Sequence, residues 1–131
     1  MTRDVLTLEK EDPIRKAWEL AEERGLRRFP VLDGGRLVGI VTDRDLRNAT
    51  ASSVVLTEKK YRDFLLDTVR IESVMTPNPG TVTPDTSLKE VAGVMLEMKV
   101  GGLPVVDGER LVGIITETDL LNALREMLPG D

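Results

Sequence analysis

A threonine and an aspartate three positions apart form the pair of side chains best suited to chemistry in this sequence. The pair occurs twice, as Thr42 with Asp45 and as Thr116 with Asp119, each time after a short apolar run. At a helix start the two residues form a variant of the capping box, in which each side chain bonds the other residue's backbone amide. Beside a crevice, the same carboxylate can accept both hydrogens of a ribose cis-diol, while nearby amides can contact phosphate. Chemistry alone favours the capping role and leaves the binding role open.

The composition narrows the reactions and partners of these pairs. The chain has 131 residues with no cysteine and no histidine, which excludes thiol nucleophiles, imidazole bases and most metal sites. It has 18 basic and 23 acidic residues, and this net negative charge argues against a nucleic-acid partner. No segment approaches the roughly 20 apolar residues of a membrane span. We expect a cytoplasmic protein with no metal and no membrane contact, and an enzyme that uses Asp43, Asp45 or Glu117 is the least favoured class.

An internal repeat organises the chain. Residues 30–49 align without a gap on residues 104–123, at an offset of 74, with identities at 14 of 20 positions. The same offset pairs Met1-Thr2 with Met75-Thr76. Neither copy is long enough to bury a core alone, so the two should pack together. We predict an α+β fold of two β-α-β-β-α repeats packed sheet to sheet with pseudo-twofold symmetry: repeats at residues 1–50 and 69–131, and a helical connector at residues 51–68.

Local signals place the elements of each repeat. Asp12 as N-cap and Pro13 as first helical residue predict a helix start, and Gly25 predicts its end. The helix carries an apolar stripe in both copies, at Ile14, Ala17, Trp18 and Ala21 and at Leu88, Val91, Met95 and Met98. Tight hairpins are predicted at residues 29–41 and 103–115, and short leading strands at residues 5–8 and 81–83.

Two features have alternative interpretations. Gly39 and Gly113 lie in mid-strand, where a missing side chain serves close packing or lets a flat ring approach the backbone. In the connector, residues 51–53 are typical of a loop and Thr57 can cap a helix. A partly apolar helix face is expected at Tyr61, Phe64, Leu65 and Thr68. This helix could equally cover the module or contact another subunit.

The order of the motifs resembles a known family. A Met-Thr start and an apolar helix are followed by Leu-Pro-Val-Val-Asp-Gly at residues 103–108 and by Leu-Val-Gly-Ile-Ile-Thr at residues 111–116, with close copies upstream. In this order, and twice in register, they resemble a tandem pair of cystathionine β-synthase (CBS) domains, the Bateman module. The connector and the second motif most resemble stand-alone CBS proteins of the acetoin-utilisation type. The resemblance implies a regulatory module that binds AMP, ADP, ATP or S-adenosylmethionine between its repeats, needs no cofactor, and modulates an associated enzyme or transporter.

The resemblance also implies which residues contact the ligand. Asp45 and Asp119 would hold the ribose hydroxyls, and Thr42 and Thr116 would contact the ribose or phosphate. The other implied positions line the adenine or face the sugar and phosphate: Thr7, Leu8, Arg28 and Pro30 in the first copy, and Thr81, Val82, Leu103 and Pro104 in the second. Arg44 and Thr118, inside the two motifs, are further candidate ligand contacts because the copies differ there.

The two copies differ in charge around the motif. The first has Arg27, Arg28, Arg44 and Arg47 where the second has Gly101, Gly102, Thr118 and Leu121. The arginines could be a solvated surface. They could also make bidentate contacts to a nucleotide phosphate, which would leave the second cleft to a less anionic adenosine compound. We therefore expect an adenine-nucleotide sensor that acts as a homodimer, and the alternative is a dimerisation or interaction module without ligand.

Overall fold

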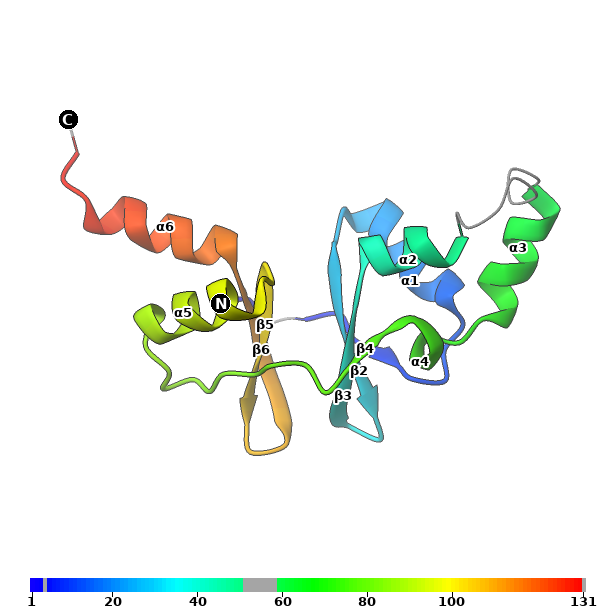
Figure 1. Ribbon diagram of the computed structural model, residues 1–131, viewed down its shortest axis with the longest axis horizontal. Coiled ribbons are helices and arrows are strands. Elements are labelled where there is room, and N and C mark those ends of the chain that lie inside the picture. The colour runs from blue at the N-terminus through cyan, green and yellow to red at the C-terminus, as the bar shows by residue number, and fades with distance from the viewer. Residues whose placement is uncertain (4, 51–58, 131) are drawn as a thin grey trace. The chain divides into compact units, whose positions relative to one another are not determined.

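The computed structural model describes residues 1–3, 5–50 and 59–130, and the chain divides into two compact units (Figure 1). The first unit is Leu6–Asn78, and the second unit combines Met1–Val5 with Pro79–Asp131. Each unit mixes helices with strands, which confirms the predicted α+β class. The residues that open the chain therefore belong to the unit built from the second repeat.

Paired strands form the centre of the first unit. They are β1 (Leu8–Glu9), β2 (Arg28–Asp33), β3 (Arg36–Thr42) and β4 (Thr76–Pro77). β2 pairs with β1 in parallel and with β3 antiparallel, and β4 pairs antiparallel with β3. The predicted β2–β3 hairpin is confirmed, and its turn uses Gly34 and Gly35 at φ values of 59° and 88°. Glycine reaches this left-handed region without steric cost, and such turns match the twist of paired strands.

In the described residues of the first unit the helices are α1 (Ile14–Arg24), α2 (Asp43–Thr50), α3 (Lys59–Thr68) and α4 (Ile71–Val74). Ile14 of α1 and Phe29 of β2 are fully buried in a cluster that also takes in Leu66 of α3 and Ile71 of α4. The predicted stripe on α1 is thus confirmed. Gly25 ends the helix as predicted, at a φ of 65° with its amide bonded to the carbonyl of Ala21.

The second unit repeats this plan with less strand pairing. Its elements are α5 (Leu88–Met98), β5 (Gly102–Asp107), β6 (Arg110–Thr116) and α6 (Glu117–Met127). β5 and β6 form the predicted antiparallel hairpin. Val82 makes a single parallel bridge to Val105, and Thr2 makes an antiparallel bridge to Ile114. Val91, Met95 and Leu103 lie in the core of this unit.

The predicted start of the first helix was wrong by one residue. Pro13 is the N-cap and Ile14 the first helical residue, and no side chain caps the helix. The amide of Ile14 donates instead to the carbonyl of Val69, at 2.9 Å. Because that bond satisfies the free amide, the carboxylate of Asp12 turns back to accept from the amide of Glu9.

The leading strands and the second apolar stripe also differ from the prediction. The first leading strand is Leu8–Glu9 instead of residues 5–8, because only these residues reach the β2 ladder while residues up to Val5 belong to the second unit. Its counterpart is the single bridge at Val82. Leu88 and Met98, at the ends of α5, are 45% and 46% exposed. In the described part of the second unit no third helix follows α6 to cover them.

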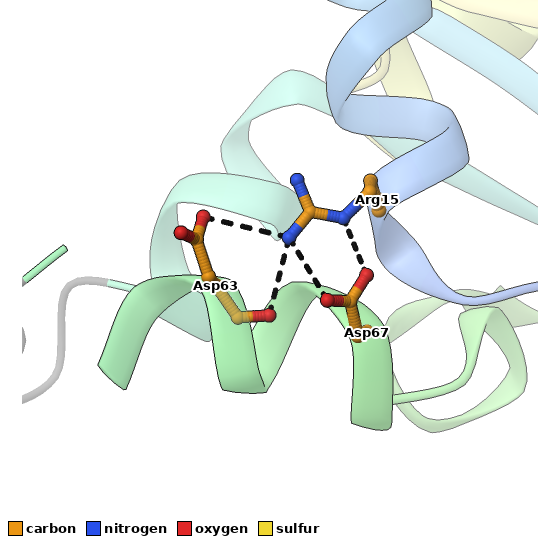
Figure 2. Close-up of polar contacts among 3 residues, drawn as sticks. All are labelled: Arg15, Asp63 and Asp67. Carbon is orange, nitrogen blue, oxygen red and sulfur yellow. Dashed lines mark hydrogen bonds and ion pairs between the residues drawn. The ribbon is translucent and has the colours of Figure 1, made fainter. Parts of the chain in front are cut away.

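α3 lies within the predicted connector, and the residues of its expected partly apolar face are mostly exposed. Leu66 is buried, whereas Tyr61, Phe64 and Thr68 are exposed. A polar clamp lies on the neighbouring turns, where the guanidinium of Arg15 on α1 reaches both Asp63 and Asp67 of α3 (Figure 2). Leu66, on the buried side of α3, packs in the core of the unit. Residues 51–53 and Thr57, predicted as loop and cap, lie outside the described residues.

Candidate functional site

The first Thr–Asp pair lies where β3 ends and α2 begins, and it forms a complete capping box. The amide of Thr42 donates to Oδ2 of Asp45 at 2.9 Å, and the amide of Asp45 donates to Oγ1 of Thr42 at 3.2 Å. The capping role that the sequence favoured is therefore confirmed. Both side chains are half-buried. A carboxylate has two acceptor oxygens, so engagement of Oδ2 leaves Asp45 with capacity for a ligand.

The second pair occupies the same junction between β6 and α6. The amide of Thr116 donates to Oδ2 of Asp119 at 2.8 Å. The hydroxyl of Thr116 donates to the same oxygen at 3.3 Å. Both junctions thus keep one oxygen of an aspartate in the helix cap and present a half-buried carboxylate beside the end of a hairpin.

Strand register brings further first-copy residues to the first junction. Arg28 is the direct cross-strand partner of Thr42 in the β2–β3 ladder. Arg44 is exposed in the first turn of α2. Leu8 pairs with Val31, one residue beyond Pro30. The side chains of Leu8 and Pro30 lie in the core, so a ligand could reach these two positions only through their backbone.

The second-copy residues follow the same arrangement. The amide of Val82 donates to the carbonyl of Pro104 at 3.1 Å, which joins the leading segment to β5. The side chains of Val82, Leu103 and Pro104 are buried. Thr81 and Thr118 are exposed. Each unit therefore contains the whole set of positions that the sequence assigned to its own copy of the motif.

The four arginines of the first copy do not share one location. Arg27 and Arg47 line a hollow of about 320 Å³ in the first unit, which Trp18, Leu26 and Leu46 also line. Arg28 instead pairs across the ladder with Thr42, because successive residues of an extended chain point to opposite sides. None of the sequence motifs predicted this hollow. Trp18, in the apolar stripe of α1, is one lining residue that the sequence analysis had already singled out.

The mid-strand glycines serve close packing. A Cβ on Gly39 would collide with the side chain of Met75, and a Cβ on Gly113 would lie 2.7 Å from the carbonyl oxygen of Thr2. Of the two interpretations of these glycines, the structure shows the packing one. In each unit the space above the glycine is filled by the Met-Thr segment that opens the other repeat.

Comparison with known proteins places these features in one family. The model of the CBS domain matches the chain twice, at residues 1–52 and 71–126. A CBS domain-containing protein of Dictyostelium discoideum is 35% identical over 130 residues, which are 98% of this chain and 90% of that protein. An inosine-5'-monophosphate dehydrogenase of Korarchaeum cryptofilum is 34% identical over 119 residues, but the chain spans only 22% of that enzyme.

Solved structures agree with this assignment. A putative acetoin utilization protein (AcuB) from Vibrio cholerae is 34% identical, with a TM-score of 0.75 over 98% of this chain and 94% of that one. CBSX2 in complex with AMP gives a TM-score of 0.81 at 28% identity, over 96% of this chain and 92% of that one. The CBS domain pair of MJ0100, in complex with 5'-methylthioadenosine and S-adenosyl-L-methionine, gives 0.80 at 27%, over 98% of this chain and 94% of that one.

The described residues include no helix long and apolar enough to cross a membrane.

One assignment follows from three findings together: the duplicated hairpin and helix, the Thr–Asp junction in each unit, and the matches over nearly the whole chain. The chain belongs to the CBS domain family and carries the domain as a pair.

Proposed function

We propose that this CBS pair is a cytoplasmic regulatory module that binds adenosine compounds at its Thr–Asp junctions and modulates an associated enzyme or transporter without catalysing a reaction itself. The observation that carries the proposal is that two CBS structures of the same fold were solved with AMP and with 5'-methylthioadenosine and S-adenosyl-L-methionine. The junctions of this chain offer the matching chemistry.

The aspartates are the proposed ribose ligands. Oδ2 of Asp45 is held by the amide of Thr42, and Oδ2 of Asp119 by the amide of Thr116, so each carboxylate is fixed in position before a ligand arrives. The remaining oxygen can accept a hydrogen bond from a ribose hydroxyl. A fixed acceptor loses little freedom on binding, which favours affinity.

The backbone of the leading segments is the proposed contact for adenine. The side chains of Leu8 and Val82 are buried, and the strand pairing of Leu8 and the bond from Val82 to Pro104 hold these segments in place. Their peptide groups, together with those at Thr7 and Thr81, can offer the donors and acceptors that a purine edge requires. The two junctions would thus bind the same nucleoside in equivalent ways.

Charge separates the two proposed sites. The first turn of α2 carries Asp43 and Asp45, and the first turn of α6 carries Glu117 and Asp119. Such acidic turns repel a phosphate unless cations compensate. In the first copy Arg28 and Arg44 can do so through charge-assisted hydrogen bonds. The second copy has Gly102 and Thr118 at those positions, which suits a neutral or cationic compound such as S-adenosylmethionine.

A thermal-shift panel of AMP, ADP, ATP, NADH and S-adenosylmethionine tests the proposal. A ligand at a hundredfold its dissociation constant adds about 2.7 kcal/mol of stability, enough for a clear rise in Tm. Asp45→Asn and Asp119→Asn keep an oxygen for the helix cap but lose the carboxylate, so each should lose the shift at its own site. Asp43→Asn, two positions before Asp45, is the matched control and should keep it. Absence of a shift with every compound would contradict the proposal.

A second candidate function is supported by the capping boxes themselves. Both Thr–Asp pairs already satisfy helix amides, so a structural role accounts for their recurrence without a ligand. In that case the chain is a homodimeric interaction module whose clefts stay empty. Unchanged Tm values in the nucleotide panel, combined with a stable dimer, would favour this function.

A further inference from the structure

The hollow of about 320 Å³ in the first unit lies between the end of α1 and the first turns of α2. Its apolar lining comes from Trp18, Ala21, Leu26 and Leu46. Leu46 is buried, and Trp18 and Leu26 are half-buried. Ligand pockets of proteins have volumes of about 300–1,000 Å³. The hollow is at the lower end of this range, so it suits a compact small molecule.

Charged side chains form the rim of the hollow. Asp43 and Arg47 pair with each other at 3.7 Å. Glu22 and Arg27 also line the hollow, and no described residue forms an ion pair with either of them. The rim therefore keeps one carboxylate and one guanidinium for a ligand. A molecule that carries both a cation and an anion matches this pair, whereas a molecule with a single charge would leave one of the two groups without a partner.

The second repeat lacks this chemistry. Four lining residues differ in type at the equivalent positions, 74 residues later: Trp18 corresponds to Ala92, Glu22 to Leu96, Arg27 to Gly101 and Arg47 to Leu121. The second unit has the same helices and hairpin without them. The indole and the rim charges are therefore not required by the fold, which is the pattern expected of a binding site added to one copy of a repeat.

Contacts among three elements hold the walls of the hollow in place. The amide of Asp43 donates to the carbonyl of Arg27 at 3.0 Å, which ties the segment after α1 to the start of α2. On α3, the guanidinium carbon of Arg62 lies 5.9 Å from the centre of the Trp18 ring, within the range of a cation–π contact. A site whose walls are fixed before the ligand arrives loses little freedom on binding.

The hollow is separate from the Thr–Asp junction of the same unit. Leu46 and Arg47 follow Asp43 by three and four positions, so the three side chains share one side of α2. Asp45 is only two positions from Asp43 and therefore lies on another side of the helix, where its carboxylate accepts from the amide of Thr42. With α2 between them, the hollow and the junction can hold two different ligands.

We propose that the hollow binds a free α-amino acid with an apolar side chain. The guanidinium of Arg27 binds the carboxylate through two parallel hydrogen bonds, and the carboxylate of Glu22 accepts from the ammonium group. The apolar side chain of the ligand packs against Trp18 and Leu46. This binding requires no nucleotide. Its experiments are therefore done without one, and their failure would leave the nucleotide proposal standing.

Tryptophan fluorescence tests the site directly, because Trp18 is the only tryptophan of the chain. L-leucine and L-phenylalanine should each change its intensity in a saturable manner, whereas glycine, which has no apolar side chain, should not. Isocaproate lacks the ammonium group of leucine and isoamylamine lacks its carboxylate, so each should bind at least about tenfold more weakly than L-leucine. Equal binding of isocaproate and L-leucine would overturn the choice of an amino acid. The absence of a saturable change with both amino acids would overturn the site.

Substitutions at the rim test the two charged contacts. Arg27→Gly and Glu22→Leu introduce the residues of the second repeat, and both side chains are exposed, so the circular dichroism spectrum should not change. Calorimetry should find L-leucine binding weakened at least about tenfold in each variant. Arg24→Gln and Glu23→Gln are the matched controls, because these exposed residues of α1 lie outside the lining, and they should bind as the wild type does. Unchanged affinity in Arg27→Gly and Glu22→Leu, or an equal loss in the controls, would overturn the proposal.

Discussion

Met75 packs on Gly39 so closely that the glycine has no room for a side chain. Gly113 is the counterpart of Gly39 at the offset of 74, and the carbonyl oxygen of Thr2 and the side chain of Met1 crowd it in the same way. The Met-Thr segment that opens each repeat thereby completes the hairpin of the other repeat. If the two repeats were produced as separate chains, each unit would lose the Met-Thr segment that packs on its hairpin.

Substitution of Gly113 should measure the strength of this packing. In Gly113→Ala the new Cβ would lie 2.7 Å from the carbonyl oxygen of Thr2, so backbone must move. Overpacking of this kind lowers the free energy of unfolding by about 1–3 kcal/mol. Gly39→Ala should lower the free energy of unfolding by less, because the atom nearest to its new Cβ is in the flexible side chain of Met75. Urea denaturation gives both values.

Gly93 provides the control for these two substitutions. It lies inside α5, and a Cβ at this position would have open space, with no neighbouring atom within 4 Å. Gly93→Ala should raise the free energy of unfolding by about 0.5–1 kcal/mol, because alanine is the better helix former. If Gly113→Ala behaved like Gly93→Ala, the packing account would be wrong.

Lys99 occupies a backbone conformation that suits glycine. It ends α5 at a φ of 57° and a ψ of 46°, and its counterpart at the end of α1 is Gly25, at a φ of 65°. Lys99→Gly should raise the free energy of unfolding by about 1 kcal/mol, because it removes the left-handed strain. Lys99→Ala keeps the strain and serves as the control. Gly25→Ala should lower the free energy of unfolding, because it introduces the same left-handed strain at the end of α1. Thermal denaturation of the three variants is the measurement, and a destabilised Lys99→Gly would contradict it.

The first capping box should contribute measurably to stability. Thr42→Ala leaves the amide of Asp45 without its acceptor, which should lower the free energy of unfolding by about 0.5–2 kcal/mol. Thr42→Ser restores the hydroxyl and should recover most of the loss. Guanidinium denaturation measures both. Equal losses in the alanine and serine variants would point to the methyl group instead of the hydrogen bond.

The clamp between Arg15 and α3 should make the first unit sensitive to acid. The hydrogen bond from Arg15 holds the pKa of Asp67 below its usual value. A carboxylate whose pKa is depressed by folding stabilises the protein above its unfolded pKa, about 3.9, and this contribution is lost as the pH falls through the folded pKa. Because Asp67 is exposed, the effect should be modest and weaken with salt.

Proton titration by NMR should find the pKa of Asp67 restored upward in Arg15→Gln. In Asp67→Asn, the Tm should fall less steeply below pH 4 than in the wild type. Asp85→Asn, in a turn of the second unit, is the control, because its carboxylate has no role in the clamp. Parallel Tm profiles for wild type and Asp67→Asn would show that the clamp contributes nothing to acid stability.

Calorimetry with AMP should distinguish the arginines of the first copy. If Arg28 and Arg44 bind phosphate, Arg28→Ala and Arg44→Ala should each weaken AMP binding by about tenfold, which corresponds to 1.4 kcal/mol. The affinity for adenosine, which has no phosphate, should change little. Arg36→Ala, at the exposed start of β3, is the control. Unchanged AMP affinity in both variants would assign the two arginines to the solvated surface.

Local patterns were enough to predict most elements of this protein. The repeat, the hairpins, the stripe on α1 and the cap at Gly25 follow from residue spacing and turn chemistry within a few positions. The Thr–Asp capping box is local in the same way, because its partners are three residues apart. Such features depend on neighbours in the chain, which the sequence shows directly.

Only the tertiary structure decided the features that join distant residues. The amide of Ile14, at the start of α1, bonds the carbonyl of Val69, and Arg15 bonds Asp63 and Asp67 of α3, roughly fifty residues away in the chain. The role of Gly39 depends on Met75. Sequence determined that this chain carries two copies of a CBS repeat. Packing decided which segments complete each unit, because the free energy of a close contact depends on three-dimensional neighbours that residue spacing does not specify.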